Sequence, residues 1–548
     1  MSKKSYVIIS EAPQLNYLID YVALPENYGT PEYFGREDVK AIRETVYQNL
    51  NDLNKKTNFG EKIKTYEKVL IKPNLVAPYH KFGFKADDYP ETTDPRVFEA
   101  VVSFIKQFND NIVIIESSGK GMPTTASFKI TGLDRVAKHY GTGLVPLELQ
   151  PVVRYMVPKA EIMKEVYIPE ILDQVVKGSA FYISVPKMKT NTYTDVTLGF
   201  KNAMGTLPYN LRERNHTYHI NKKLADLLYL FKPDLTVIDG IIGGEGNTPA
   251  PVDPVEMGVI VSGDNSVETD RVATRMMGFD PNAIKLQAEA DKRGFNNSNV
   301  EVIGHQKVVP FRPALKSIMD EGMQKTFPNL TVLVGFSLND APEITDINAV
   351  TPELVKKIEM SCDGGCIPTI KFNFEAFKYS DATNYEAFDY VLIVGNGVTV
   401  NGKKYYFDAE GKAYDTEAIR KMDRKKVGIG ECVRHIEEAC DVFCQGCPSI
   451  ADIPNALSGG AGVAPPLFSP QNVQLPMIFE EVIKLFLKKQ QMIQAGIWVD
   501  CESKYEDRIF EIPELSDEEK AMNYIEWPLP EVPEHIKEQA LKAYTLPL

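Results

Sequence analysis

Val69-Leu-Ile-Lys72-Pro-Asn74 is a short apolar run that ends in a lysine, a proline and an asparagine. Strands that are buried on both faces of a sheet are continuous apolar runs of this kind. Similar runs alternate with helical stretches as far as residue 310, at Ile112–Glu116, Phe181–Val185, Leu235–Asp239, Val259–Ser262 and Val300–Ile303. The pattern predicts an α/β fold in which residues 1–310 form a parallel-sheet domain that binds a substrate or an anion.

Polar or small residues follow each predicted strand, and ligands of open α/β sheets bind beyond the carboxyl ends of the strands. We therefore expect Lys72, Lys189 and Lys201 to approach one cleft and act in catalysis, since a lysine can hold a carboxylate or phosphate as a point charge. Asp239 is a further candidate acid or base at a strand end. The residues expected to bind the substrate are Asn74, Ser117, Ser118, Lys120, Lys187, Asn202 and Glu245.

These polar residues also have a simpler interpretation. Each lysine could be a solvated surface side chain, and Asp239 and Glu245 could be turn or cap residues. Several lysine-bearing segments in one α/β unit favour a shared anion site instead. The loops 117–121 and 243–246 contain glycines that allow close backbone approach. We expect both loops to line a gap between this site and the cysteines that follow.

His216 and His219 stand three residues apart in the segment 212–219. That spacing predicts one helical face bearing both imidazoles, which would suit metal ligation or proton transfer. His216 is therefore a candidate catalytic residue. The alternative is an ordinary surface helix or a helix that gates the substrate.

Four of the seven cysteines fall within one segment, and Pro448 follows the last of them. The segment is Gly430-Glu-Cys432-Val-Arg-His-Ile-Glu-Glu-Ala-Cys440-Asp-Val-Phe-Cys444-Gln-Gly-Cys447, and Cys362-Asp-Gly-Gly-Cys366 precedes it. Thiolates close in sequence suit an iron–sulfur cluster or zinc. In a chain with no secretory signal they indicate ligands or redox thiols rather than disulfides.

An iron–sulfur cluster of the [4Fe–4S] type is the cofactor that the cysteines favour, because a proline after the last cysteine is common in cluster-binding segments. Zinc held by four thiolates is the alternative, and free or redox thiols are a third interpretation. The favoured ligands are Cys362, Cys366, Cys432 and Cys447, with Cys440 and Cys444 as alternates.

The rest of the chain divides into two further predicted parts. Residues 311–460 read as a smaller α/β domain that carries the cysteines, with strands at Leu330–Gly335, Tyr390–Gly395, Val427–Ile429 and Val442–Phe443 and a hairpin at Asn401-Gly402. Residues 461–548 read as C-terminal helices and an extended, proline-containing tail. Met477–Gln490 is an amphipathic helix, and Ser516 to Glu519 is a capping box.

Composition excludes several classes of function. The chain has 548 residues and a net charge of −14, so phosphate backbones would repel it and a nucleic-acid partner is not expected. No apolar stretch reaches the roughly 20 residues of a membrane span, and no signal peptide is recognisable. We expect a cytoplasmic protein.

Several of these segments resemble the family called domain of unknown function 362. The likeness covers residues 65–290, and its most specific part is Phe200-Lys-Asn-Ala-Met-Gly205. Where the family usually has a histidine after its lysine–threonine pair, this chain has Asn191. The resemblance implies an α/β fold and an iron–sulfur association common in anaerobes, but no defined reaction. Gly430-Glu-Cys432 and Gly446-Cys447-Pro448 are locally similar to cluster-binding segments of hydrogenase small subunits.

Taken together, the sequence favours an iron–sulfur oxidoreductase that acts on a small anionic or carbonyl substrate. An electron-transfer protein is the expected partner. Two alternatives remain: a redox-neutral metal-dependent isomerase or dehydratase, and a non-enzymatic protein of electron transfer or metallocentre assembly.

Overall fold

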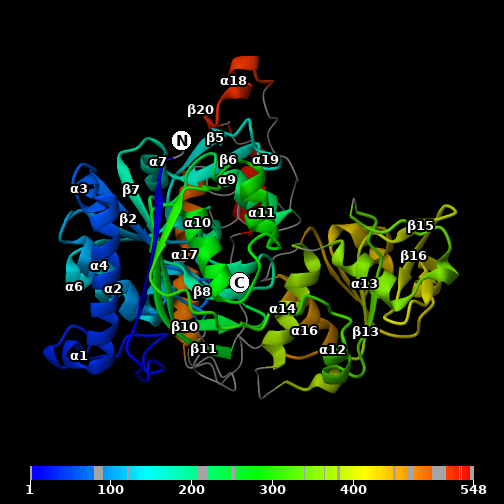
Figure 1. Ribbon diagram of the computed structural model, residues 1–548. Coiled ribbons are helices and arrows are strands. Elements are labelled where there is room, and N and C mark those ends of the chain that lie inside the picture. The colour runs from blue at the N-terminus through cyan, green and yellow to red at the C-terminus, as the bar shows by residue number, and fades with distance from the viewer. Residues whose placement is uncertain are drawn as a thin grey trace.

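The computed structural model describes residues 3–78, 91–119, 122–207, 219–248, 253–338, 340–362, 364–378, 383–447, 452–465, 474–495, 514–529, 531 and 534–543. A large sheet flanked by helices forms the first part of the molecule, and a smaller sheet with its own helices lies beside it (Figure 1). The expected α/β architecture, with a cysteine-bearing second unit and C-terminal helices, is confirmed.

The first sheet follows the order β12-β1-β11-β10-β7-β2-β3-β4. Strands β10, β7, β2, β3 and β4 run parallel to one another, as the apolar runs predict. The strands of this sheet are β1 (Ser5–Glu11), β2 (Lys68–Lys72), β3 (Ile112–Glu116), β4 (Gly143–Pro146), β7 (Ala180–Ser184), β8 (Lys187–Asn191), β9 (Asp195–Thr197), β10 (Leu235–Glu245), β11 (Asp253–Gly263) and β12 (Val300–Ile303). The β8–β9 hairpin joins the sheet through β10.

Two features of this sheet differ from the prediction. β11 is antiparallel to both β1 and β10, so one side of the sheet is mixed. The glycine-rich stretch 243–246, expected to be a loop, lies mainly within β10, which continues to Glu245. A side chain at Gly243 would come within 2.5 Å of the Phe311 ring, so glycine serves close packing here rather than a turn.

Helices cover both faces of the first sheet because its strands alternate apolar side chains between two cores. Val69 and Ile71 of β2 face one core, which α2 (Glu37–Thr57) and α4 (Pro95–Ile105) complete. Leu70 faces the other core, which α9 (Ile220–Leu227) and α10 (Ser266–Met276) complete. Because β10, β7, β2 and β3 run parallel, their polar carboxyl ends lie at one edge of the sheet.

The second sheet follows the order β15-β16-β13-β14-β18-β19, with β17 paired to β16. Its strands are β13 (Thr331–Val334), β14 (Val391–Val394), β15 (Val398–Val400), β16 (Lys403–Phe407), β17 (Ala413–Asp415), β18 (Lys426–Ile429) and β19 (Val442–Cys444). The predicted hairpin is confirmed, since Asn401 and Gly402 have φ values of 49° and 76° between β15 and β16. The helices of this unit include α12 (Glu321–Thr326), α13 (Pro352–Met360), α14 (Cys366–Lys378) and α16 (Asp452–Ala461).

The C-terminal part returns to the first unit. The predicted helix is α17 (Leu475–Gln494), whose Glu481 pairs with Lys129 at 2.6 Å. The capping box at Ser516 begins α18 (Asp517–Ala521), and β20 (Ile525–Trp527) pairs with β5 (Val152–Met156). The expected extended tail is wrong in part, because residues 534–543 form the helix α19 (Glu534–Ala543).

Candidate functional site

Lys72 lies at the carboxyl end of β2 and is only 1% exposed. Its Nζ is 2.7 Å from Glu116 Oε1, at the end of the neighbouring strand β3, and donates a hydrogen bond of 2.8 Å to Asn202 Oδ1. Leu75 N and Ser117 N donate to the two oxygens of Glu116. The ends of two adjacent parallel strands thus form a buried ion pair.

The segment 199–205 is folded against this pair. Asn202, in the 3-10 helix Lys201–Thr206, donates to Pro73 O and Ser184 Oγ at 3.1 Å each. A side chain at Gly205 would lie 2.5 Å from Glu116 Oε1 and 2.7 Å from Lys72 Nζ. The asparagine and the glycine of this motif are therefore both needed for the strand ends to close.

Asn74 joins the same network, and Asp270 supports the segment from behind. Asn74 Nδ2 donates to Asn202 Oδ1 at 3.3 Å, while its own Oδ1 is buried and has no hydrogen bond among the described residues. Asp270, on α10, accepts from Gly199 N at 2.7 Å and Phe200 N at 3.1 Å. The sequence placed Asn74 at this site but gave Asp270 no supporting role.

Two more lysines enter from β8. Lys187 Nζ is 2.8 Å from Asp239 Oδ2, and both side chains are fully buried. Lys189 Nζ donates to Glu91 O at 2.5 Å and lies 3.3 Å from Glu91 Oε1. Each lysine of this edge that was predicted from β2 or β8 therefore has a buried carboxylate partner.

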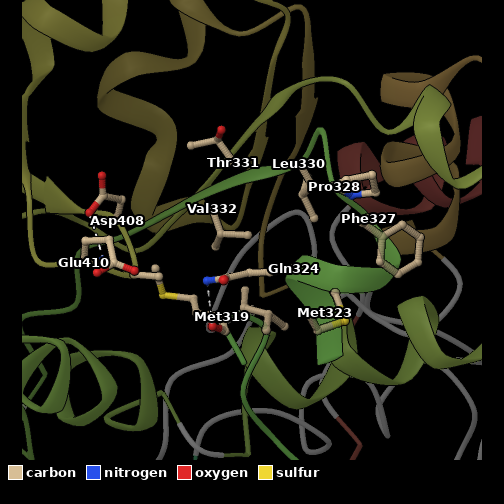
Figure 2. A pocket seen from close by; sticks show the side chains of 12 residues that line it. Met319, Met323, Gln324, Phe327, Pro328, Leu330, Thr331, Val332, Asp408 and Glu410 are labelled. Carbon is tan, nitrogen blue, oxygen red and sulfur yellow. Dashed lines mark hydrogen bonds between the residues drawn. The ribbon is translucent and has the colours of Figure 1, made fainter. Parts of the chain in front are cut away.

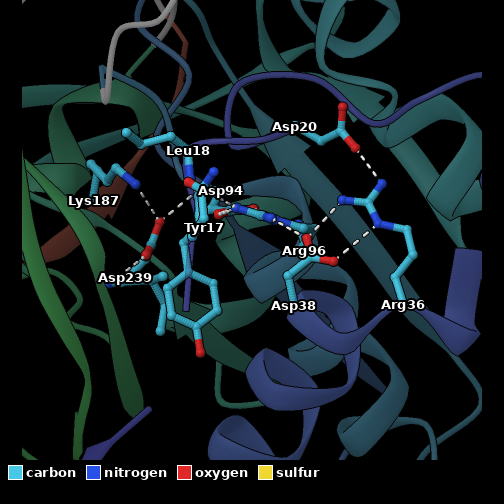
Figure 3. A network of polar contacts seen from close by, with 11 residues as sticks. Tyr17, Leu18, Asp20, Arg36, Asp38, Asp94, Arg96, Lys187 and Asp239 are labelled. Atoms are coloured by element: carbon cyan, nitrogen blue, oxygen red, sulfur yellow. Dashed lines mark hydrogen bonds and ion pairs between the residues drawn. The ribbon is translucent and has the colours of Figure 1, made fainter. Parts of the chain in front are cut away.

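Asp239 connects this edge to a larger polar network (Figure 3). Asp94 N donates to Asp239 Oδ2 at 2.7 Å, and the Asp94 carboxylate binds the fully buried guanidinium of Arg96. Arg96 also contacts Asp38 on α2 at 2.6 Å and donates to Tyr17 O. The N-terminal segment and α2 are thus held to the strand ends by hydrogen bonds to Arg96.

Lys201 is 6% exposed and lies near the pair of Lys189 and Glu91. Its positive charge opposes the rise that burial causes in the pKa of Glu91. Lys72, Lys189 and Lys201 therefore lie at one edge of the first sheet, as expected. The expected cleft is not seen in the described part of the chain, because these side chains are buried. The lysines are not the solvated surface residues of the simpler interpretation.

Burial brings the proton affinities of the paired groups closer together. It raises the pKa of Glu116, of Asp239 and of Glu91 above the usual carboxyl values, against the opposing effect of the neighbouring lysine in each case. Burial also lowers the pKa of Lys189. A carboxyl group with a raised pKa beside a lysine is the kind of pair that general acid–base chemistry uses.

The remaining predicted residues have other positions. Ser117 N, just after β3, donates a hydrogen bond to Gly205 O. Ser118 Oγ donates to Ser127 Oγ at 2.7 Å, and Ser127 belongs to α5 (Thr124–Thr131). Glu245 contacts Arg312, whose backbone N donates to Glu245 Oε2 at 2.7 Å, rather than the lysines. Lys120 and His216 lie outside the described residues.

His219 is the first described residue of the segment that was expected to form a helical face. Its φ is 67°, in the left-handed region, and it lies immediately before α9. The other residues of that segment, His216 included, lie outside the described part of the chain.

The cysteines gather at the carboxyl edge of the second sheet. β18 and β19 are parallel neighbours, with Ile429 opposite Cys444. The segments that carry Cys432 and Cys447 therefore leave the sheet side by side, and Glu431 N donates to Gly446 O at 2.6 Å. Cys362 follows α13, and Cys366 begins α14.

Gly430 lies against two of the thiols. Its φ and ψ are 105° and 148°, and a side chain there would lie 3.1 Å from Cys432 Sγ and 3.4 Å from Cys366 Sγ. A glycine in a conformation that other residues avoid thus leaves room for the sulfur atoms. The free cysteines of the described chain form no disulfide.

The thiols of Cys362, Cys366, Cys432 and Cys447 lie close enough for the charge of one to affect the pKa of another. A hydrogen bond with Cys362 and then burial raise the pKa of Cys366 well above the usual value, and the charges of Cys447 and Cys432 raise it further. Burial raises the pKa of Cys432 to about 12, with contributions from Cys362 and Cys447. Four thiols crowded in this way become thiolates only when a positively charged group lies between them.

Cys440 differs from these four. Burial raises the pKa of Cys440 to about 11, and its charged neighbours are Lys426, Asp441 and Glu437 rather than thiols. Cys440 Sγ instead contacts Ile436 O at 3.6 Å. Cys444 is buried in the same apolar cluster as Cys362 and Cys366. Cys501 lies outside the described residues.

The donor set fits an iron–sulfur cluster better than a single ion. Within the described residues, no group of three or more His, Cys, Asp or Glu side chains is arranged to hold one metal ion. A four-iron cluster makes a different demand, because each thiolate binds a different iron and the sulfur atoms stand further apart. The four cysteines are soft donors of the kind that such a cluster takes, and Gly430 leaves room beside two of them.

A separate pocket of about 310 Å³ lies in the second unit (Figure 2). Its lining includes Met319, Met323, Phe327, Leu330 and Val332. It adjoins the amino end of β13, whereas the thiols lie beyond the carboxyl ends of the parallel strands β18 and β19. The pocket is therefore at the opposite edge of the sheet from the cysteines.

Comparison with known proteins identifies the first unit. The family described as domain of unknown function (DUF362) matches residues 69–275, which include the three buried lysine–carboxylate pairs of the first sheet and end before the cysteines. The chain carries a domain of the DUF362 family. The thylakoid-associated protein sll1697 of Synechocystis sp. (strain ATCC 27184 / PCC 6803 / Kazusa) is 26% identical over 254 residues, which are 44% of this chain and 73% of that protein.

Several residues of the site escaped the sequence analysis as site residues. Glu91 and Glu116 are buried carboxyl groups whose lysine partners are distant in the sequence, and Arg96 is a buried cation. Glu116 ends a predicted strand next to Lys72, so the strand-end rule could have found it. Glu91 gives no such signal.

Proposed function

We propose that the protein is an iron–sulfur oxidoreductase in which Cys362, Cys366, Cys432 and Cys447 hold one [4Fe–4S] cluster. The observation that carries this proposal is the position of the Cys432 and Cys366 sulfurs against Gly430, with Cys362 and Cys447 near enough to raise the pKa values of both thiols. When bound, a cluster of this type supplies one-electron transfer or a Lewis-acidic iron.

The DUF362 domain supplies the second half of the proposed activity. The substrate is a small anionic or carbonyl compound that binds at the edge of the first sheet near Lys72, Lys189 and Lys201. The substrate oxygen accepts a hydrogen bond from a lysine, and the partner carboxylate of that lysine takes or returns a proton. Asn74 Oδ1, buried without a partner among the described residues, is a further contact for a substrate donor.

Substitution of single cysteines tests the ligand assignment. We expect Cys432→Ser and Cys447→Ser to abolish the visible absorption of the anaerobically purified protein, because each removes one of four required thiolates. Cys440→Ser is the matched control from the same segment and keeps the absorption. Loss of the absorption in the control, with retention in the first two variants, would show that the ligand set is wrong.

A redox-neutral isomerase or dehydratase is the second candidate, favoured by the three buried lysine–carboxylate pairs. Proton transfer alone needs no electron acceptor. Turnover of a candidate substrate in the absence of any acceptor, with a cluster that stays in one oxidation state, would establish this function over the first.

The expected cytoplasmic location remains part of the proposal. In the described part of the chain no helix is long and apolar enough to cross a membrane. The name of the Synechocystis relative associates that protein with thylakoids. Fractionation of cells into membranes and supernatant decides between a free and a membrane-associated protein.

A further inference from the structure

The β8–β9 hairpin reaches from the lysine site to the cysteine-bearing unit. Asn191 Oδ1 fixes its turn by accepting hydrogen bonds from Tyr193 N at 3.0 Å, Thr194 N at 3.1 Å and Thr194 Oγ1 at 3.0 Å. Lys187 and Lys189 lie on the strand that enters this turn. The turn is therefore a defined structure that continues directly from the buried ion pairs.

Tyr193 projects from the turn into the second unit. It is 1% exposed, and its OH lies 2.8 Å from Oγ1 of Thr369 on α14, which is 3% exposed. Thr369 Oγ1 also lies 3.0 Å from Gly365 O, and a carbonyl can only accept. The single hydroxyl proton of Thr369 is thus used towards Gly365, so Tyr193 is the donor to Thr369.

The acceptor at the end of this chain of hydrogen bonds belongs to the cysteine loop. Gly365 lies between Cys362 and Cys366, and Gly365 N donates to Cys362 O at 3.0 Å. A second contact secures the hairpin, since Lys316 Nζ lies 2.9 Å from Asp195 Oδ1. The hairpin that carries two of the buried lysines is thereby tied to the loop that carries two of the thiols.

We propose that Tyr193 is a positioning residue that sets the conformation of the loop 362–366 relative to the lysine-bearing strand. Through Thr369 and Gly365, Tyr193 fixes the positions of the Cys362 and Cys366 thiols. It thereby also affects the electronic environment of the proposed cluster. The expected effect of Tyr193 on the redox potential rests on the proposed function, because it requires a bound cluster. The expected effect on the conformation of the cysteine loop does not, because it can be measured in the protein without iron.

The first test uses the protein without iron. In Tyr193→Phe, which keeps the ring but loses the donor, alkylation of Cys362 and Cys366 by iodoacetamide becomes about fivefold faster, the factor that corresponds to a typical buried hydrogen bond. Cys440, in the same protein, is the internal control and reacts at its original rate. Peptide mass spectrometry measures all three.

The second test uses the anaerobically loaded protein. The midpoint potential of the cluster in Tyr193→Phe shifts by on the order of 40 mV, a fivefold change in a one-electron equilibrium. Thr369→Val, which breaks the same chain of hydrogen bonds, gives a shift of the same sign. Tyr155→Phe is the matched control, since Tyr155 is also 1% exposed and its OH binds Asp173 far from the cysteines.

The two tests separate the two proposals. A wild-type protein that takes up no iron refutes the proposed cluster, and the alkylation rates then decide the role of Tyr193 alone. An unchanged alkylation rate in Tyr193→Phe overturns the inference. So does an unchanged potential in a variant that is fully loaded with iron, because a merely structural role for Tyr193 lowers stability without moving the potential.

Discussion

At the residue scale, Gly430 bears most directly on the proposed cluster site. Its backbone lies in a region that is essentially open to glycine alone, and two cysteine sulfurs lie where a side chain would project. The same chain has positive-φ glycines in ordinary turns, such as Gly402, where a side chain would meet nothing within 4 Å. A side chain at Gly402 would add backbone strain alone, whereas one at Gly430 would also crowd the thiols.

We expect Gly430→Ala to lose most of its bound iron. The substitution adds about 1–3 kcal/mol of backbone strain and pushes a methyl group against Cys432 and Cys366. Gly402→Ala carries comparable strain and retains its iron. Iron analysis of both purified variants measures the difference, and equal retention would mean that Gly430 is not part of the site.

At the scale of elements, the ends of neighbouring strands carry opposite charges. Lys72 on β2 and Glu116 on β3 are 1% and 2% exposed in their side chains, so neither ion has water as an alternative partner. Removing one member leaves the other charge buried and uncompensated. The pair therefore stabilises the strand ends only while both members are present.

We predict that Lys72→Met lowers the free energy of unfolding by about 3–5 kcal/mol. The double variant Lys72→Met with Glu116→Gln should recover much of that loss, because no ion is then buried alone. Denaturant unfolding of the wild type, the single and the double variants measures this. If the double variant were as unstable as the single one, the pair would not be coupled.

The strand ends also show what the sequence could and could not predict. Continuous apolar runs located most strands because burial on both faces demands them. The direction of β11 was not predictable, because an apolar run is the same in parallel and antiparallel pairing. Gly243 was misread as a loop residue, because its partner Phe311 is distant in the sequence. Glu91 is 98 positions from Lys189 and gave no local signal.

At the scale of the whole molecule, the connection between the two sheets is anchored by a buried carboxyl group. Glu359 on α13 is 0% exposed and accepts from Ser317 Oγ at 2.8 Å and Ile318 N at 2.6 Å. Burial raises its pKa from 4.5 to about 7. The folded protein therefore holds a proton at Glu359 that the unfolded chain has already released.

This shift makes stability depend on pH in a defined direction. Between pH 4.5 and about 7 the folded state binds more protons at Glu359 than the unfolded state, so the contribution of this group falls as pH rises. Glu359→Gln lacks this dependence. Relative to the wild type, the variant should gain up to about 3 kcal/mol of stability between pH 4.5 and pH 7.

Denaturant unfolding of the iron-free proteins across that pH range checks this expectation. Glu438→Gln, at an exposed position in the same unit, is the control and should follow the wild type. A constant difference between Glu359→Gln and the wild type at all pH values would contradict the raised pKa.

The central claim is that four cysteines from three separate segments hold one cluster beside a DUF362 domain. Quantification of iron, acid-labile sulfide and zinc in the anaerobically purified protein tests it most directly. We expect about four irons and four sulfides per chain and no stoichiometric zinc. One zinc per chain, without iron or sulfide after anaerobic reconstitution, would contradict it.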